Sequence, residues 1–262
     1  MNDPERLGVR DWRWDLRVAA AFLTRLPIRL PEGYLPSDLG RASRLFPVVG
    51  LGLGLAAGLI FAIALELGLG PLLAAIAAVA VQIALTGALH EDGLGDLADG
   101  FGGGSTPEKK LEIMRDSRIG IYALVTVVLT LIARIAAIEA LEDTIVVLGA
   151  LLAAGAASRA AMVWLMRYLE PARPNGLGAS AGRPEQQNVL IAAAIAAAVA
   201  LLALEPRLAI AALIGSVAGA FFVVTLAKRQ IGGQTGDVLG AAQQAAELCC
   251  LIAVVLAVAV FL

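Results

Sequence analysis

The chain has 262 residues, 59% of them hydrophobic, and a mean hydropathy of +0.83. Soluble domains are usually about 45–50% apolar, and long runs of Ala, Leu, Ile and Val recur here. The composition excludes an ordinary soluble domain and indicates an all-α, polytopic membrane helical bundle in one domain, residues 1–262. The net charge of −2 decides little, and nothing in the sequence indicates a nucleic-acid partner.

The first 45 residues precede any stretch long enough to cross a bilayer. Residues 14–30 combine an apolar stripe with Arg17, Arg25 and Arg29, which is typical of a helix lying in the membrane interface. We therefore expect residues 1–45 to form a cytoplasmic and interfacial segment. No small-residue cleavage site follows the N-terminal arginines, which argues against a cleaved signal peptide.

Seven later windows approach the length of about 20 apolar residues that a spanning helix needs. They are residues 46–66, 72–90, 119–141, 145–165, 188–204, 209–227 and 246–262, of which the fifth and seventh are short. The two cysteines, Cys249 and Cys250, are adjacent inside the last window, which argues against a disulfide or a zinc site.

Charge predicts the orientation of these spans. Seven spans put the N-terminal segment and the connections 91–118, 166–187 and 228–245 on one side of the membrane. These regions hold 8, 4, 3 and 2 Lys and Arg residues, together 17 of 20, whereas the opposite connections hold only Arg207. Because cytoplasmic loops carry the excess of positive charge, we expect the N-terminus and any active site to face the cytoplasm.

The strongest motif is the acidic stretch 90–100, directly after the second window. Asp92, Asp96 and Asp99 would fall within an arc of about 60° on a helix, so they would share one face. Three neighbouring carboxylates repel one another unless a cation neutralises them, and oxygen ligands suit Mg²⁺. A solvated acidic loop is the alternative, but ionisable residues at a membrane boundary commonly mark function. We predict a metal site within a cytoplasmic catalytic loop, residues 91–118.

Other residues of this stretch are less informative. Gly93 and Gly95 weaken a helix, but they also allow a phosphate or a ligand backbone to approach closely. His90 would face away from the three aspartates on a regular helix, so its role as a base has little support.

A second polar cluster follows. The Thr-Pro pair at 106–107 predicts the start of a short cytoplasmic helix over about 107–117, which can fold back over the metal site. Arg115 and Arg118 carry forked donors suited to phosphate oxygens. Asp116 can add a metal ligand or orient an arginine. The alternative is that these arginines only anchor a span to lipid headgroups.

Two arginines lie within predicted spans, where a charge is costly unless it is paired or hydrated. Arg159 lies about two turns from the cytoplasmic end of the fourth span, so we expect it to bind a phosphate or carboxylate in the same pocket. Arg134 lies deeper in the third span. For Arg134 we expect either a pair with Glu139 or a side chain that snorkels outward.

The stretch 232–240, rich in glycine, connects the sixth and seventh windows. It is not a P-loop, because no Lys follows the second glycine. Backbone N–H groups with Gln234, Thr235 and Asp237 can hold a phosphorylated ligand. A plain turn is the alternative.

These motifs together resemble the adenosylcobinamide-GDP ribazoletransferase family, also called cobalamin synthase. The resemblance rests on residues 22–27, 46–47, 90–100, 114–118, 158–159, 167–168, 176–178 and 232–237, which occur in the family's order. Glu91 departs from the pattern, where an apolar residue is expected, and can supply another ligand or face water. Residues 170–187 offer little else to align.

The resemblance implies an enzyme of the bacterial inner membrane that joins adenosylcobinamide-GDP to α-ribazole or its 5′-phosphate, needs Mg²⁺ and releases GMP. Its partners would be these substrates and the lipid bilayer, with a homo-oligomer or association with other cobalamin-pathway enzymes left open. On this hypothesis the metal ligands are Asp92, Asp96 and Asp99. Further catalytic carboxylates would be Asp116 and Asp237, and the substrate-binding residues Arg115, Arg118, Arg159, Gln234 and Thr235.

Three other functions are open. A CDP-alcohol phosphotransferase would need Ala-Arg shortly after the Asp-Gly and a later paired aspartate block. A UbiA-like prenyltransferase would carry a second aspartate-rich motif, whereas Asp237 is solitary. A non-catalytic corrinoid transporter would show broken helices or polar residues near the membrane midplane. We expect the polar residues of this chain to gather on one side of the membrane instead.

Overall fold

The computed structural model describes residues 12–30 and 32–261, and this part of the chain is helical, with one isolated bridge between Pro171 and Gln234 in place of any sheet. Residues 1–11 of the predicted N-terminal segment and the last residue of the seventh window lie outside the described residues. The longer helices are α3 (Phe46–Glu66), α4 (Gly70–Thr86), α5 (Leu89–Gly103), α7 (Ile121–Glu139), α8 (Thr144–Tyr168), α10 (Gln186–Ala203), α11 (Pro206–Ile231) and α12 (Gly236–Phe261). The shorter elements are α1 (Trp12–Leu23), α2 (Asp38–Ala42), a 3₁₀ turn (Ser43–Leu45), α6 (Pro107–Ile113) and α9 (Leu177–Ser180).

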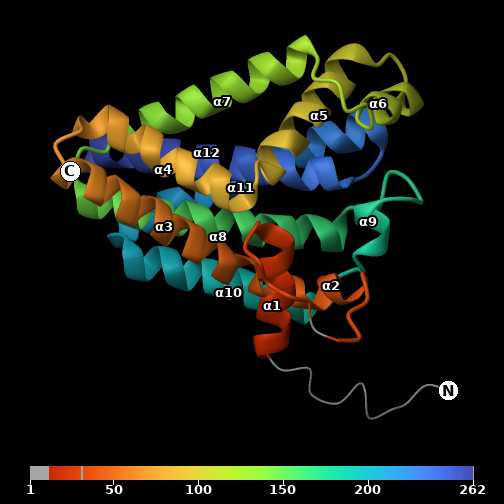
Figure 1. Ribbon diagram of the computed structural model, residues 1–262, viewed down its shortest axis with the longest axis horizontal. Helices are drawn as coiled ribbons and strands as arrows, with labels where there is room; N and C mark the ends of the chain where they lie inside the picture. The colour runs from red at the N-terminus through yellow and green to blue at the C-terminus, as the bar shows by residue number, and fades with distance from the viewer. Residues whose placement is uncertain (1–11, 31, 262) are drawn as a thin grey trace.

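The described helices form the multi-pass bundle that the composition predicts (Figure 1). By length and apolarity, six could cross a membrane: α3 with its preceding turns, α7, α8, α10, α11 and α12. The bent pair α4 and α5 can count as a seventh span. The predicted count of about seven is therefore confirmed.

The second predicted span is wrong at its C-terminal end. α4 stops at Thr86, and α5 leaves the bend at 88° to it. Gly87 and Ala88 both have left-handed backbone conformations, with φ of 65° and 59°, and such residues end a helical hydrogen-bond ladder. Apolar residues continue through the bend, so hydropathy alone could not detect it. Residues 91–118, predicted as a loop, are mostly helical in α5 and α6.

The seventh predicted span begins too late. The apolar window opened at 246, whereas α12 starts at Gly236. Gln243, Gln244 and Glu247 lower the hydropathy of this first part, yet all three are buried in the bundle. Because the polar face of α12 points into the bundle, hydropathy missed the first two to three turns of this helix.

Figure 1 shows that α6, α9 and the connection between α11 and α12 lie at one end of the bundle, while the C-terminus lies at the other. The connections with most of the basic residues are therefore at the same end, as the charge pattern requires. α1 ends at Leu23, earlier than the predicted 14–30 helix. Its buried Asp15 pairs with Arg41 at 2.8 Å and Arg44 at 2.6 Å, which ties α1 to the turns before α3.

Small residues allow the long helices to touch. A Cβ atom placed on Gly50 of α3 would lie 2.0 Å from the carbonyl oxygen of Gly155 in α8, so a larger residue would force these helices apart. Lipid tails are as apolar as the helix side chains, so the hydrophobic effect does not drive helices together in a membrane. Close backbone contact of this kind stabilises their packing instead. Cys249 and Cys250 are both free, as predicted.

Candidate active site

α5 carries the acidic motif as a regular helix, so Asp92, Asp96 and Asp99 project from one side of it. Asp92 is exposed, and Asp96 and Asp99 are half-buried. His90 and Glu91 are buried instead. The helix thus presents carboxylates outward and packs its other residues into the bundle.

Asp237, in the first turn of α12, lies beside this acidic face. A Cβ atom on Gly93 would be 3.0 Å from both the Cα and the carbonyl oxygen of Asp237, so the two helices meet backbone to backbone. The glycine therefore admits a neighbouring helix, where the sequence suggested a phosphate. The negative charges of Asp92, Asp237 and Asp99 all act on Asp96 as a result.

Arg173 supplies a positive charge that the motif analysis missed. Its Nη2 atom lies 3.6 Å from Oδ2 of Asp237, and its guanidinium offsets part of the negative charge acting on Asp96. Arg173 lies in the segment between α8 and α9, which the resemblance could hardly align. The only signal in the sequence was the gathering of Pro, Gly and Arg in 170–187.

The glycine loop before α12 holds this arrangement together. The backbone of Gln234 donates to the carbonyl of Glu170 at 2.8 Å and accepts from the N–H of Ala172 at 2.8 Å. Thr235 accepts from the N–H of Val238 at 3.3 Å and its hydroxyl donates to Asp237 at 3.1 Å. Both Gln234 and Thr235 are buried. They therefore orient the Arg173 segment and the start of α12.

Asp99 has partners of its own. Its Oδ2 accepts from the N–H of Gly120 at 2.6 Å and its Oδ1 from that of Ala123 at 2.9 Å, so it satisfies free donors at the start of α7. Among the described residues, no group of three His, Cys, Asp or Glu side chains is arranged to hold a metal ion. The three aspartates share a face but do not form a closed cage.

Asp116 and Arg118 bind each other in the connection between α6 and α7. Nε of Arg118 donates to Oδ1 of Asp116 at 3.0 Å. The hydrogen bonds from Arg118 lower the pKa of Asp116 from its usual 3.8 to about 2, so this carboxylate is a weak proton acceptor. Arg115 is exposed nearby. The predicted N-cap Thr106 accepts from the N–H of Lys109 at 3.3 Å, which confirms the start of α6.

Two cavities, each lined in part by charged side chains, meet the ends of the acidic face. One, of about 400 Å³, is lined by Asp99, Asp116 and Arg118 among others. The other, of about 380 Å³, lies at the bend and is lined by Arg25 and Asp92 among others. The main chain of Arg25 is tied to the end of α4, because its backbone N–H donates to the carbonyl of Leu85 at 2.7 Å.

Arg159 and Arg134 belong to a buried network. Nη1 of Arg159 lies 2.6 Å from Oε2 of Glu247, and its side chain is 2% exposed, so it is not open to a substrate phosphate. Arg134 pairs with Glu247 at 2.6 Å and with Glu91 at 3.1 Å, and its side chain is buried. Both expectations for it, a pair with Glu139 and a side chain that snorkels outward, are therefore wrong. These polar groups lie within the spans, contrary to the prediction that they gather on one side.

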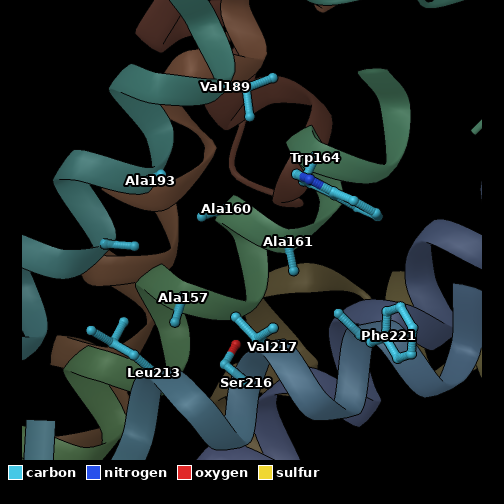
Figure 2. A pocket seen from close by; sticks show the side chains of 12 residues that line it. Ala157, Ala160, Ala161, Trp164, Val189, Ala193, Leu213, Ser216, Val217 and Phe221 are labelled. Carbon is cyan, nitrogen blue, oxygen red and sulfur yellow. The ribbon is translucent and has the colours of Figure 1, made fainter. Parts of the chain in front are cut away.

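A further cavity, of about 250 Å³, lies between α8, α10 and α11 (Figure 2). Alanines, Trp164 and Phe221 line it, with Ser216 as its polar side chain. No charged residue is among its lining residues. It therefore cannot neutralise a phosphate or hold a metal, and the acidic face is the candidate active site.

Known proteins resemble this chain over almost its whole length. The family model described as cobalamin-5-phosphate synthase matches residues 15–255. An adenosylcobinamide-GDP ribazoletransferase of Bradyrhizobium diazoefficiens is 47% identical over 238 residues, 91% of this chain and 92% of the relative. Proteins of the same name from a Sinorhizobium species and from Brucella ovis are 44% and 43% identical, covering 95% and 90% of this chain and 99% and 94% of their own lengths. No solved structure gives a significant match. The chain therefore belongs to the cobalamin-5-phosphate synthase family.

Proposed function

We propose that this chain is a membrane transferase that joins adenosylcobinamide-GDP to α-ribazole, or to its 5′-phosphate, with release of GMP. The family and the names of its relatives supply the reaction class. One observation carries the assignment of the site: Asp237 and Arg173, distant in sequence, lie beside the aspartates of α5.

The proposed location is a bacterial inner membrane, with the N-terminus and the acidic face in the cytoplasm. Support comes from charge, because 17 of the 20 Lys and Arg residues fall in the N-terminal segment and the three connections at one end of the bundle. A site at that end would receive its charged substrates from the cytoplasm.

The reaction requires one bond to phosphorus to form and one to break. A ribazole hydroxyl oxygen attacks the phosphorus linked to cobinamide, and the bond from that phosphorus to the bridging oxygen breaks. GMP leaves with the electron pair, and a base takes the hydroxyl proton. Asp237 is a better candidate for this base than Asp116, whose pKa of about 2 makes it a weak acceptor.

The residues of the acidic face fit Mg²⁺, which prefers oxygen donors. Mg²⁺ is usually held by one or two carboxylates together with substrate phosphates and water, so a closed protein cage is unnecessary. Asp92 and Asp96 would hold it, beside Asp237, whereas Asp99 is engaged with α7. When bound, the ion would neutralise charge on the phosphates of the substrate and leaving group.

Arginines at both cavities would bind the phosphates. Arg118 lines the cavity near α6, and the exposed Arg115 precedes it by three residues. Arg25 lines the cavity at the bend, and Arg173 lies beside Asp237. Two cavities at the ends of one acidic face, each lined by an arginine and an aspartate, fit a reaction that brings two substrates together. Arg159 is not one of these phosphate-binding residues, because its guanidinium is paired with Glu247.

A corrinoid transporter would also show a broken helix and buried charges, and both are present. Family membership favours the transferase, because the relatives bear the name of a transferase. The same match argues against the two other aspartate-dependent transferases.

The test is GMP release from adenosylcobinamide-GDP by the purified protein in detergent micelles. We expect release only when ribazole and Mg²⁺ are both present. Asp96→Asn should abolish most of this release, whereas Glu66→Gln, at the exposed last residue of α3, should not. Equal GMP release without ribazole would contradict transfer, and equal release without divalent metal would contradict the metal assignment.

A further inference from the structure

We infer that Arg134 is a positioning residue: it binds both halves of the bent helix pair α4–α5 and so sets the direction in which the aspartate face points. The effect of Arg134 on catalysis rests on the proposed function, whereas its effect on the orientation of α5 does not.

One guanidinium group joins three helices. Nη2 of Arg134, on α7, donates to Oε1 of Gln82 in α4 at 2.8 Å. Nη1 donates to Oε1 of Glu91 in α5 at 3.1 Å. Nη2 also donates to Oε1 of Glu247 in α12 at 2.6 Å. The planar fork of an arginine suits such divergent contacts, because its donors have fixed directions.

These contacts are buried and reinforced. The side chains of Arg134, Glu91 and Glu247 are 2%, 9% and 1% exposed. Gln244 of α12 donates to Oε1 of Glu91 at 3.1 Å and accepts from Arg134 at 3.2 Å. Removing one partner from a buried pair leaves an uncompensated charge, so the arrangement resists rearrangement. Glu91 is thereby held from two helices.

The position of Glu91 determines that of its neighbour. Successive residues of a helix differ by about 100° around its axis, so holding Glu91 inward turns Asp92 away from the bundle interior. The bend itself offers little restraint, because Gly87 and Ala88 interrupt the helix. The orientation of α5 therefore depends on its contacts with neighbouring helices, and Arg134 makes such contacts on both sides of the bend.

Arg159 provides a matched comparison within the same network. It is equally buried, carries the same charge and pairs with Glu247 at 2.6 Å. Among the described residues its hydrogen bonds run to Ser158 and Glu247, and none reaches α4 or α5. If the network only stabilised the bundle, losing either arginine would affect α5 alike.

The decisive experiment is hydrogen–deuterium exchange of the full chain in detergent micelles, comparing wild type with Arg134→Gln, Glu91→Gln and Arg159→Gln. We expect the first two variants to accelerate exchange several-fold across residues 89–103. Arg159→Gln should leave that segment at the wild-type rate and accelerate exchange in α8 or α12. Equal exchange of 89–103 in the Arg134 and Arg159 variants would overturn the inference. If Arg134→Gln does not fold, the test rests on Glu91→Gln. A wild-type exchange rate of residues 89–103 in that variant would also overturn the inference.

A second measurement tests the catalytic consequence. The Mg²⁺ concentration that gives half-maximal GMP release should rise about tenfold in Glu91→Gln, the scale of effect when an outer partner of a metal ligand is lost. Arg159→Gln should not raise it. If wild-type protein releases no GMP, the proposed function fails while the exchange comparison still stands. A wild-type Mg²⁺ response in Glu91→Gln, with GMP released, would overturn the catalytic part.

Discussion

Two groups of arginine–carboxylate pairs differ sharply in environment. Arg134 and Arg159 bind Glu247 inside the bundle with side chains 2% exposed, whereas Arg118 binds Asp116 with a side chain 87% exposed. Opening the buried pairs leaves unpaired charge in a medium that solvates it poorly. Opening the exposed pair costs little, because water and salt replace the partner. The first group can fix helices, and the second can exchange its partner for a substrate.

α5 connects these two environments. Its inner residue Glu91 belongs to the buried network, and its outer aspartates belong to the candidate site. A change on the inner side should therefore alter stability and orientation. A change on the outer side should alter chemistry without unfolding the bundle.

The largest effect should follow from removing the centre of the buried network. Glu247→Leu leaves Arg134 and Arg159 without their shared carboxylate, and we expect a loss of about 3–5 kcal/mol in the free energy of unfolding. Denaturant titration in micelles measures it, with exposed Glu66→Leu as control. An unchanged midpoint would mean that the network contributes little.

On the outer side, Asp96→Asn should lower GMP release by about 100-fold, the scale seen when a preorganised electrostatic group is lost from an active site. The unfolding midpoint should stay near that of wild type, because Asp96 is only half-buried and the aspartates around it carry like charge. Steady-state kinetics and unfolding of the same preparation separate the two. Loss of both activity and stability would mean that Asp96 stabilises the fold, as the buried Glu247 network does.

The contact between Gly93 of α5 and Asp237 of α12 sets the spacing of the acidic face. Gly93→Ala would place a methyl group 3.0 Å from the backbone of Asp237, so the helices must shift by a few tenths of an ångström. Because misplacement by about 1 Å can cost about 100-fold in rate, we expect a loss of about tenfold. Gly52→Ala, which meets no atom within 4 Å, is the matched control. Equal kinetics for both variants would show that this spacing is unimportant.

The smallest effect concerns the exposed pair. Asp116→Asn should leave the acid side of the pH–rate profile unchanged over about pH 5 to 8. The reason is that Arg118 lowers the pKa of Asp116 to about 2, so the group is already ionised throughout this range. Its contribution would be lost only as the pH falls towards 2. Disappearance of an acid limb in the variant would assign the titrating group to Asp116.

Local signals predicted several features correctly. The spacing of Asp92, Asp96 and Asp99 predicted one acidic helix face, and the Thr-Pro pair at 106–107 predicted the start of α6. Each depends on residues within two helical turns, where helical geometry is independent of the rest of the chain.

Other features depend on residues far apart. Arg134 and Glu91 are 43 positions apart, and Arg159 and Glu247 are 88 apart, so no local pattern could pair them. Arg159 looked available for phosphate only because the inward polar face of α12 had not been recognised. The bend after Thr86 was not predicted, because a hydropathy window averages over the residues on both sides of it.

The order of apolar and basic segments was sufficient to predict about seven candidate membrane spans with the charged connections at one end, because hydropathy and charge are properties of the residues themselves. Which charges meet depends on tertiary structure. A carboxylate or guanidinium inside the bundle must find a partner, and that partner is selected by which helices pack together. The same packing brings Asp237 and Arg173 to the aspartates of α5 and withdraws Arg159 from them.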